Sequence, residues 1–201
     1  MHRVPISWLH TQAYCEYQIY LQHVLGVKAA PTAEMLRGTE AHHTLEERHK
    51  EAAELTLSVD QALEKAQKEV LVLAAREVRV EGTLLVGKID EVQFMPDRVR
   101  IIDDKPGFAA FPGNVRQVWG YCLAFEQCYK PALPVFGVLR NRDSGMEFWD
   151  GPFLGQQRLD VSNVVERILS ILGGQLQAER TANPNKCKPC RLKAACDAAG
   201  R

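Results

Sequence analysis

The sequence has no long apolar run and no hydrophobic leader. None of its apolar stretches approaches the roughly 20 residues that a membrane-crossing helix needs, and the N-terminus MHRVPISWLH lacks the apolar segment of a secretory signal. We therefore expect a cytoplasmic protein with no membrane partner. Thiols are usually kept reduced in that compartment, so clustered cysteines indicate metal binding rather than disulfides.

Net charge is also absent. Lys and Arg together number 25, the same as Asp and Glu together. The overall charge therefore gives no support to a nucleic-acid partner, and such a function must depend on local patches or on the site itself. Internal repeats and low-complexity segments are lacking as well, so nothing indicates a repeat architecture.

The composition is that of an ordinary globular protein. Hydrophobic residues make up 46% and charged residues 25% of the 201, which argues against a disordered or fibrous protein. This length suits one large domain with a sizeable core. We expect residues 1–201 to form a single domain.

Hydrophobic periodicity predicts helices first, then strands, then an alternation of the two. That order favours an α/β fold in which helices cover a sheet, rather than a sandwich or a bundle. The predicted helices are Ser7–Leu25, Thr32–Leu55, Asp60–Val70, Asn114–Cys128 and Val161–Leu176. The predicted strands are Arg76–Gly82, Leu84–Phe94, Arg98–Asp104, Leu133–Leu139 and Met146–Trp149.

Two of these strands are expected to pair as a hairpin that gathers carboxylates. If Lys88–Phe94 and Val99–Asp104 pair around a four-residue turn, opposed residue numbers sum to 193 and Asp90 faces Asp103. Opposed side chains lie about 5 Å apart, so two carboxylates there repel unless a cation lies between them. Lys105 would join the same face, which suggests a divalent-metal site.

Asp104 would point to the opposite face of the hairpin. The ordinary alternative for the whole group is a solvated strand end that carries a salt bridge. Apolar neighbours on both strands indicate that the strands are mostly buried, and buried acids need a partner.

A second candidate site lies near the end of the chain, in CKPCRLKAAC. Cys187, Cys190 and Cys196 fall within ten residues, which indicates a metal site that needs a fourth ligand.

An ordered set of short motifs resembles those of the RecB-like nucleases in the PD-(D/E)xK superfamily. The motifs are Gly38-x-x-x-His42, Gly87-x-x-Asp90, Asp103-x-Lys105 and Gln117-x-x-x-Tyr121. Cys15 with Cys187-x-x-Cys190-x5-Cys196 matches the iron–sulfur variant of that group. The small size and the lack of a helicase portion look most like the CRISPR-associated exonucleases, the fourth Cas protein family. The resemblance spans Cys15 to Cys196.

The resemblance implies a restriction-endonuclease-like core, with a central mixed sheet flanked by helices. It implies that His42, Asp90 and Asp103 bind a catalytic Mn²⁺ or Mg²⁺, with the backbone carbonyl of Asp104 as a further oxygen ligand. An imidazole ligand favours Mn²⁺, because Mg²⁺ prefers oxygen. Lys105 would be the catalytic lysine, and water activated by the metal would attack a DNA phosphodiester.

Gln117 and Tyr121 are the remaining motif residues. They lie four residues apart on a predicted helix, and on one face of it they would hold the DNA or order the site. The alternative for Tyr121 is an ordinary buried, hydrogen-bonded tyrosine. His43 competes with His42 as a ligand, but the spacing from Gly38 favours His42.

The resemblance further implies that Cys15 is the fourth sulfur ligand and that the four cysteines hold a 4Fe-4S cluster. Segments 1–28 and 177–201 would form this iron–sulfur subregion. Zinc also accepts four thiolates, so the spacing by itself leaves zinc open. Cys122 and Cys128 are expected to be buried thiols outside the site.

The implied function is that of a DNA exonuclease acting on single strands or overhangs. It would process prespacers for CRISPR adaptation, an antiviral defence, in partnership with the Cas integrase complex. Two alternatives are a RecB-like nuclease of DNA repair and a non-catalytic iron–sulfur DNA-binding module. Cations around the cysteines would form either a basic patch for DNA or a solvated tail; they are Arg180, Lys186, Lys188, Arg191 and Lys193.

Overall fold

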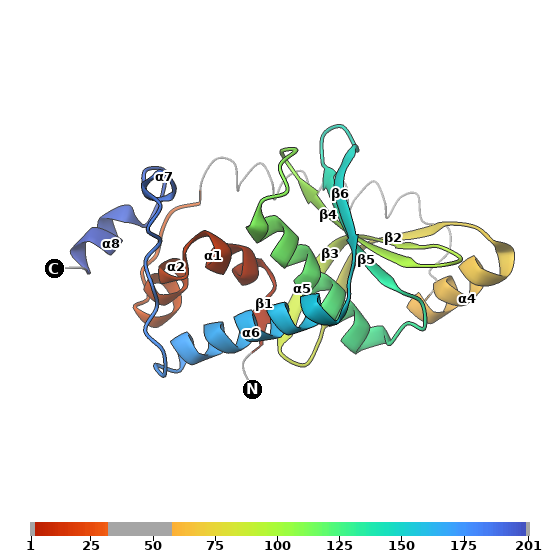
Figure 1. Cartoon of the computed structure of the whole chain (residues 1–201), viewed down its shortest axis with the longest axis horizontal. Coiled ribbons are helices and arrows are strands. Elements are labelled where there is room, and N and C mark those ends of the chain that lie inside the picture. Colours follow the sequence, from red (N-terminus) through yellow and green to blue (C-terminus); the bar gives the residue numbers. More distant parts are fainter. Residues whose placement is uncertain (1–2, 32–57, 200–201) are drawn as a thin grey trace.

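A computed structural model describes residues 3–31 and 58–199, and its strands form one mixed sheet with helices packed against it (Figure 1). The strands within these ranges are β1 (Val4–Pro5), β2 (Leu73–Glu81), β3 (Leu85–Phe94), β4 (Val99–Lys105), β5 (Val135–Asn141) and β6 (Glu147–Pro152). The helices are α1 (Ser7–Cys15), α2 (Tyr17–Ile19), the π-helical η1 (Tyr20–Val24), α4 (Val59–Glu69), α5 (Pro112–Tyr129), α6 (Gly155–Leu172), α7 (Pro184–Cys187) and α8 (Lys193–Ala198).

The sheet is ordered β1-β3-β4-β5-β6, and β2 also pairs with β3. The β1–β3 and β4–β5 pairs are parallel, and the other pairs are antiparallel. Because both orientations occur and helices lie against the sheet, the predicted α/β architecture with a central mixed sheet is confirmed.

Strand β3 has two neighbours along one edge. Its residue Val86 pairs with both β1 and β2, so these two strands lie on opposite edges of β3. Residues 92–94 pair in the same way with both β2 and β4. Strands β1 and β4 therefore share one edge of β3, one at each end, and the ladder on that edge skips residues 87–90. This break positions the candidate active site.

Helix α5 packs against β2, β3, β4 and β5 and against α1, while α6 contacts α5, α1 and β1. Helix α6 is amphipathic, since Val161, Val165 and Ile168 are buried at helical spacing. At the other end of the molecule, α7 and α8 lie near α1 and α2 (Figure 1). The two ends of the chain thus contribute to one region.

Most predicted elements are present, with shifted bounds. The Ser7–Leu25 helix is divided among α1, α2 and η1, and α6 begins six residues before the predicted Val161. The short strand β1 was not predicted, because two residues carry no periodic signal. The predicted helix Thr32–Leu55 lies outside the described residues.

Candidate active site

The acidic pair lies where the β3–β4 ladder ends. The hairpin has the predicted register, since Glu91 pairs with Ile102 and Phe94 with Val99. The pairing stops before Asp90 and Asp103, so the expectation that they form a ladder pair is wrong. Asp90 Oδ2 instead accepts a hydrogen bond of 2.7 Å from the backbone N–H of Asp104.

Both carboxylates of this pair are buried, with Asp90 8% and Asp103 3% exposed. Burial raises the pKa of Asp90 well above its ordinary value, and the negative charge of Asp103 raises it further. The hydrogen bond from the Asp104 N–H lowers the pKa of Asp90, because it stabilises the ionised carboxylate. Two acids crowded in this way form a site that favours a cation.

Lys105 connects the acids to α5. Its ammonium lies 2.8 Å from Asp103 Oδ2, in an ion pair without hydrogen-bond geometry. The same ammonium donates to Gln117 Oε1 at 3.1 Å, and Gln117 Nε2 donates to the Tyr121 hydroxyl at 3.3 Å. The structure therefore brings five of the predicted site residues together, from β3, β4 and α5.

Tyr121 is 8% exposed, and burial raises the pKa of its phenol, as do the charges of the two nearby aspartates. Gly87 is required by this ring, since a Cβ there would lie 2.9 Å from Tyr121 Cε1. Tyr121 is thus a buried, hydrogen-bonded group that orders Gln117, in agreement with the ordinary alternative for this residue.

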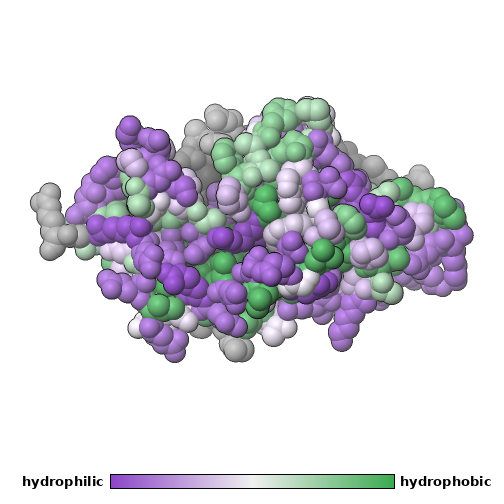
Figure 2. All heavy atoms as spheres, in the orientation of Figure 1, coloured by the Kyte–Doolittle hydropathy of each residue, from purple (hydrophilic) through white to green (hydrophobic). Residues whose placement is uncertain are grey.

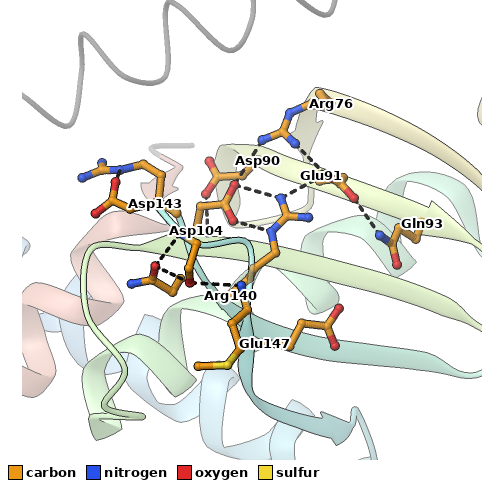
Figure 3. A network of polar contacts seen from close by, with 12 residues as sticks. Arg76, Asp90, Glu91, Gln93, Asp104, Arg140, Asp143 and Glu147 are labelled. Carbon is orange, nitrogen blue, oxygen red and sulfur yellow. Dashed lines mark hydrogen bonds and ion pairs between the residues drawn. The ribbon is translucent and has the colours of Figure 1, made fainter.

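The side chain of Asp104 alternates with those of Asp103 and Lys105 along β4, as expected, and it points toward Arg76 and Arg140 (Figure 3). It accepts hydrogen bonds from Arg140 Nε at 2.7 Å and from Arg76 Nη2 at 3.1 Å. The same two arginines bind Glu91, at 2.9 Å and 2.6 Å. We call Arg76, Glu91, Asp104 and Arg140 the ion tetrad. The ion tetrad holds the end of β4 from one face of the sheet, and Asp103 and Lys105 point to the opposite face.

Two residues near the site were missed by the sequence analysis. His10 of α1 lines the same pocket as Lys105 and Gln117, and burial lowers its pKa, followed by the charge of Lys105. Glu77, opposite Asp90 on β2, has φ +55° and interrupts the β2–β3 ladder. Neither carries a sequence signal, because each reaches the site through long-range packing. The predicted ligand His42 and its competitor His43 lie outside the described residues.

The four predicted cysteine ligands line one cavity of about 230 Å³, although Cys15 lies more than 170 residues from the others. Hydrogen bonds dock the tail beside α1: Tyr14 OH donates to the Lys186 carbonyl at 2.5 Å, and Gln18 donates to Cys190 Sγ at 3.3 Å. In residues 3–31 and 58–199, no group of three or more His, Cys, Asp or Glu is arranged to hold a single metal ion.

The two remaining cysteines differ from each other. Cys122 is fully buried in α5, as expected, and burial raises the pKa of its thiol. Cys128 is exposed, so the prediction that it is buried is wrong. It lies in the last turn of α5, on a side of the helix that is open to solvent.

Most of the tail cations have partners within the chain. Lys193 pairs with Asp197 at 2.6 Å, and Arg191 donates to the Ala30 carbonyl. Arg180 stacks over the Tyr17 ring at 4.7 Å, and Lys186 donates to the Ala13 carbonyl at 3.0 Å. The contacts of Arg180 and Lys186 join the tail to α1 and α2, whereas the Lys193–Asp197 pair lies within α8 and is exposed.

Within the described parts of the chain, no helix is long and apolar enough to cross a membrane. No protein-family model matches the sequence, and no curated protein matches it. Solved structures do match.

One matching structure is that of a protein from Eubacterium rectale described as a "putative exonuclease". The identity is 13% over 96% of this chain and 88% of that chain, with a TM-score of 0.53. A second is that of SSO0001, at 14% identity over 98% of this chain and 86% of that one, with a TM-score of 0.46. The first likeness shows a shared fold.

Proposed function

We propose that this protein is a metal-dependent DNA nuclease with a PD-(D/E)xK core of the RecB-like kind. The observation that carries the proposal is the buried pair Asp90 and Asp103 with Lys105 at the break between β3 and β4. The fold shared with the Eubacterium rectale protein is in keeping with it.

The acidic pair fits a divalent cation. Asp103 Oδ2 is buried and makes no hydrogen bond with any residue that the structure describes. The Lys105 ammonium lies 2.8 Å from this oxygen, and a divalent cation between the two buried carboxylates would further offset their negative charge. Asp90 and Asp103 would hold the ion, with the Asp104 carbonyl and His42 as proposed further ligands. When bound, Mn²⁺ or Mg²⁺ supplies Lewis-acid polarisation of the phosphate.

The chain's own residues orient the reaction around that ion. Lys105 places its ammonium 2.8 Å from Asp103, where it can stabilise negative charge that develops on the phosphate. Gln117 holds this ammonium at 3.1 Å, and Tyr121 holds Gln117 in turn. Lys105 is therefore the proposed catalytic lysine, and Gln117 and Tyr121 are positioning residues.

The finer assignment rests on the motif series. We propose exonuclease activity on single-stranded DNA or overhangs, in the processing of prespacers for CRISPR adaptation with the Cas integrase complex as partner. The supporting residues are the acidic pair, the lysine, the Gln117–Tyr121 pair and the four cysteines that meet at one cavity. A RecB-like nuclease of DNA repair would use the same chemistry with other partners.

We propose a 4Fe-4S cluster rather than zinc at the cysteine cavity, on the resemblance of the cysteine motif to the iron–sulfur nucleases. The four cysteines line one cavity, and their all-sulfur donor set suits a cluster, as it also suits zinc. A cluster bound by Cys15, Cys187, Cys190 and Cys196 would join the two ends of the chain and contribute its binding energy to folding.

A nuclease assay with 5′- and 3′-labelled single-stranded DNA tests the activity and its polarity together. The wild type should cleave with Mn²⁺, and Asp103→Ala and Lys105→Ala should each lose at least about 100-fold in rate. Asp97→Ala is the matched control, because this aspartate is exposed in the turn of the same hairpin. Equal inertness of the wild type and both site variants would favour a non-catalytic DNA-binding module.

The cluster has a separate test. Protein purified without oxygen should be brown and contain iron, Cys187→Ala should be colourless, and Cys128→Ala should stay brown because this exposed thiol lies outside the cavity. Zinc without iron in elemental analysis would refute the cluster.

A further inference from the structure

A pocket of about 480 Å³ opens beside Lys105, toward the loop 106–111 that connects β4 to α5. This volume lies within the range of small-molecule sites. Among residues 3–31 and 58–199, no Asp or Glu lines the pocket. The lining residues are His10, Lys105, Pro106, Gly107, Phe108, Ala109, Phe111, Asn114 and Gln117.

Two phenylalanines of this loop are exposed. Phe108 is 54% and Phe111 64% exposed, although full burial of such a side chain stabilises a protein by about 1.5–3 kcal/mol. Figure 2 shows hydrophobic surface gathered at the top of the molecule, over this loop and the β5–β6 hairpin. Phe108 packs edge-on against Phe148 of β6, with ring centroids 6.1 Å apart. The exposed faces of Phe108 and Phe111 are open to a ligand.

The loop that carries the two phenylalanines is held at both ends. Asn141, 2% exposed, donates to the carbonyls of Pro106 and Gly107 at 3.3 and 3.4 Å. Asn114, 8% exposed, donates to the carbonyl of Ala109 at 3.3 Å. Because buried amides fix the backbone, the rings are presented to solvent by a fixed loop.

The chemistry of the pocket matches a nucleotide. Aromatic faces stack on nucleobases, and such stacking tolerates any base. The cation of Lys105 and the amides of Asn114 and Gln117 suit phosphate and sugar oxygens. An apolar protein partner could pack on the rings, but it would leave the polar side of the pocket, formed by Lys105, Asn114 and Gln117, without partners. That side leads to the acidic pair.

We infer that this pocket is a nucleobase subsite, in which bases of single-stranded DNA stack on Phe111 and Phe108 next to the phosphate at Lys105. The inference rests on the proposed nuclease function and deepens it. Bases within a duplex are already stacked and cannot use the rings, so the subsite selects unpaired DNA.

The test measures binding of a fluorescent single-stranded oligonucleotide by anisotropy, in EDTA so that no strand is cut. Phe111→Ala and Phe108→Ala should each weaken binding about 5- to 100-fold. Phe111→Trp, which keeps an aromatic face, should bind like the wild type. Leu159→Ala on α6 is the matched control. Leu159 is 55% exposed, like the two phenylalanines, but does not line this pocket.

A second substrate separates stacking from other contacts. An oligonucleotide of the same length with base-free sugars should bind the wild type more weakly than Phe111→Ala binds the intact strand, because Phe108 remains in that variant. The double variant Phe108→Ala/Phe111→Ala should not distinguish the two strands. Thermal unfolding of each variant should match the wild type, because both rings are more than half exposed.

The remaining outcomes are distinct. If the wild type binds and cuts DNA but both alanine variants bind equally well, the subsite is refuted and the proposed nuclease function stands. If the alanine variants keep DNA binding but lose self-association in light scattering, the rings form an interface between copies and the subsite is refuted. If the wild type neither binds nor cuts DNA, both proposals fail.

Discussion

Replacing Arg140 by alanine removes one of the two arginines that join the carboxylates of the ion tetrad. Arg140 donates to Asp104 at 2.7 and 3.0 Å and to Glu91 at 2.9 Å. The carboxylate side chains are only 2% and 8% exposed. Removing one partner from a buried ion pair costs about 3–5 kcal/mol, because the other charge stays buried. Arg76 still contacts both acids, so we expect about 3 kcal/mol, near the lower limit.

The matched control is Arg100→Ala. Arg100 pairs with Glu147 on the same sheet, but the Glu147 side chain is 39% exposed. Exposed pairs contribute about 0–1 kcal/mol. With a urea dependence of about 2 kcal/mol per molar, the midpoint of unfolding should fall by about 1.5 M for Arg140→Ala and by at most about 0.5 M for Arg100→Ala.

Arg140→Lys provides a further check. Lysine keeps the charge but lacks the planar fork that binds Asp104 through two nitrogens, so its midpoint should lie between those of the wild type and the alanine variant. The reasoning is refuted if Arg140→Ala and Arg100→Ala shift the midpoint equally. Circular dichroism in a urea titration measures all three variants.

Three other predictions concern the site and the buried thiol. Burial and a neighbouring acid raise the pKa of Asp90, so the folded protein loses stability as the pH rises through that pKa and the carboxyl ionises. Asp90→Asn cannot ionise, so it should stabilise the metal-free protein at neutral pH in a urea titration. The same change should abolish Mn²⁺-dependent cleavage. Lower stability would contradict this. Gly87→Ala places a Cβ 2.9 Å from the Tyr121 ring and should cost about 1–3 kcal/mol and slow cleavage; unchanged unfolding and rate would refute the packing. Iodoacetamide and mass spectrometry should label Cys128 in the folded protein and Cys122 only after unfolding; equal labelling would contradict the burial.

The hairpin shows what sequence patterns predict well. Alternating apolar residues and a short turn determined the β3–β4 register, which is found over Glu91–Phe94. The same patterns could not predict that the ladder stops before Asp90. Beyond that break the same edge of β3 is occupied by β1, a two-residue strand that carries no periodic signal.

Residues that reach the site across the fold could not be predicted. His10 approaches Lys105 because α1 begins directly after β1 and packs on α5, where a Cβ at Gly113 would lie 2.9 Å from His10 Cδ2. The cysteines were easier, since three of the four lie within ten residues. The fourth cysteine, Cys15, was assigned from a family resemblance, because spacing alone does not select it.

The alternation of β4 has a consequence for how the strand enters the sheet. A slip by one residue exchanges the two faces of a strand. Slipped β4 would still offer an acid to each face, since Asp103 and Asp104 are consecutive. Lys105, however, would then turn toward the face that holds Arg76 and Arg140, where three cations would repel one another. The two arginines therefore disfavour the slipped register of β4 relative to the native one.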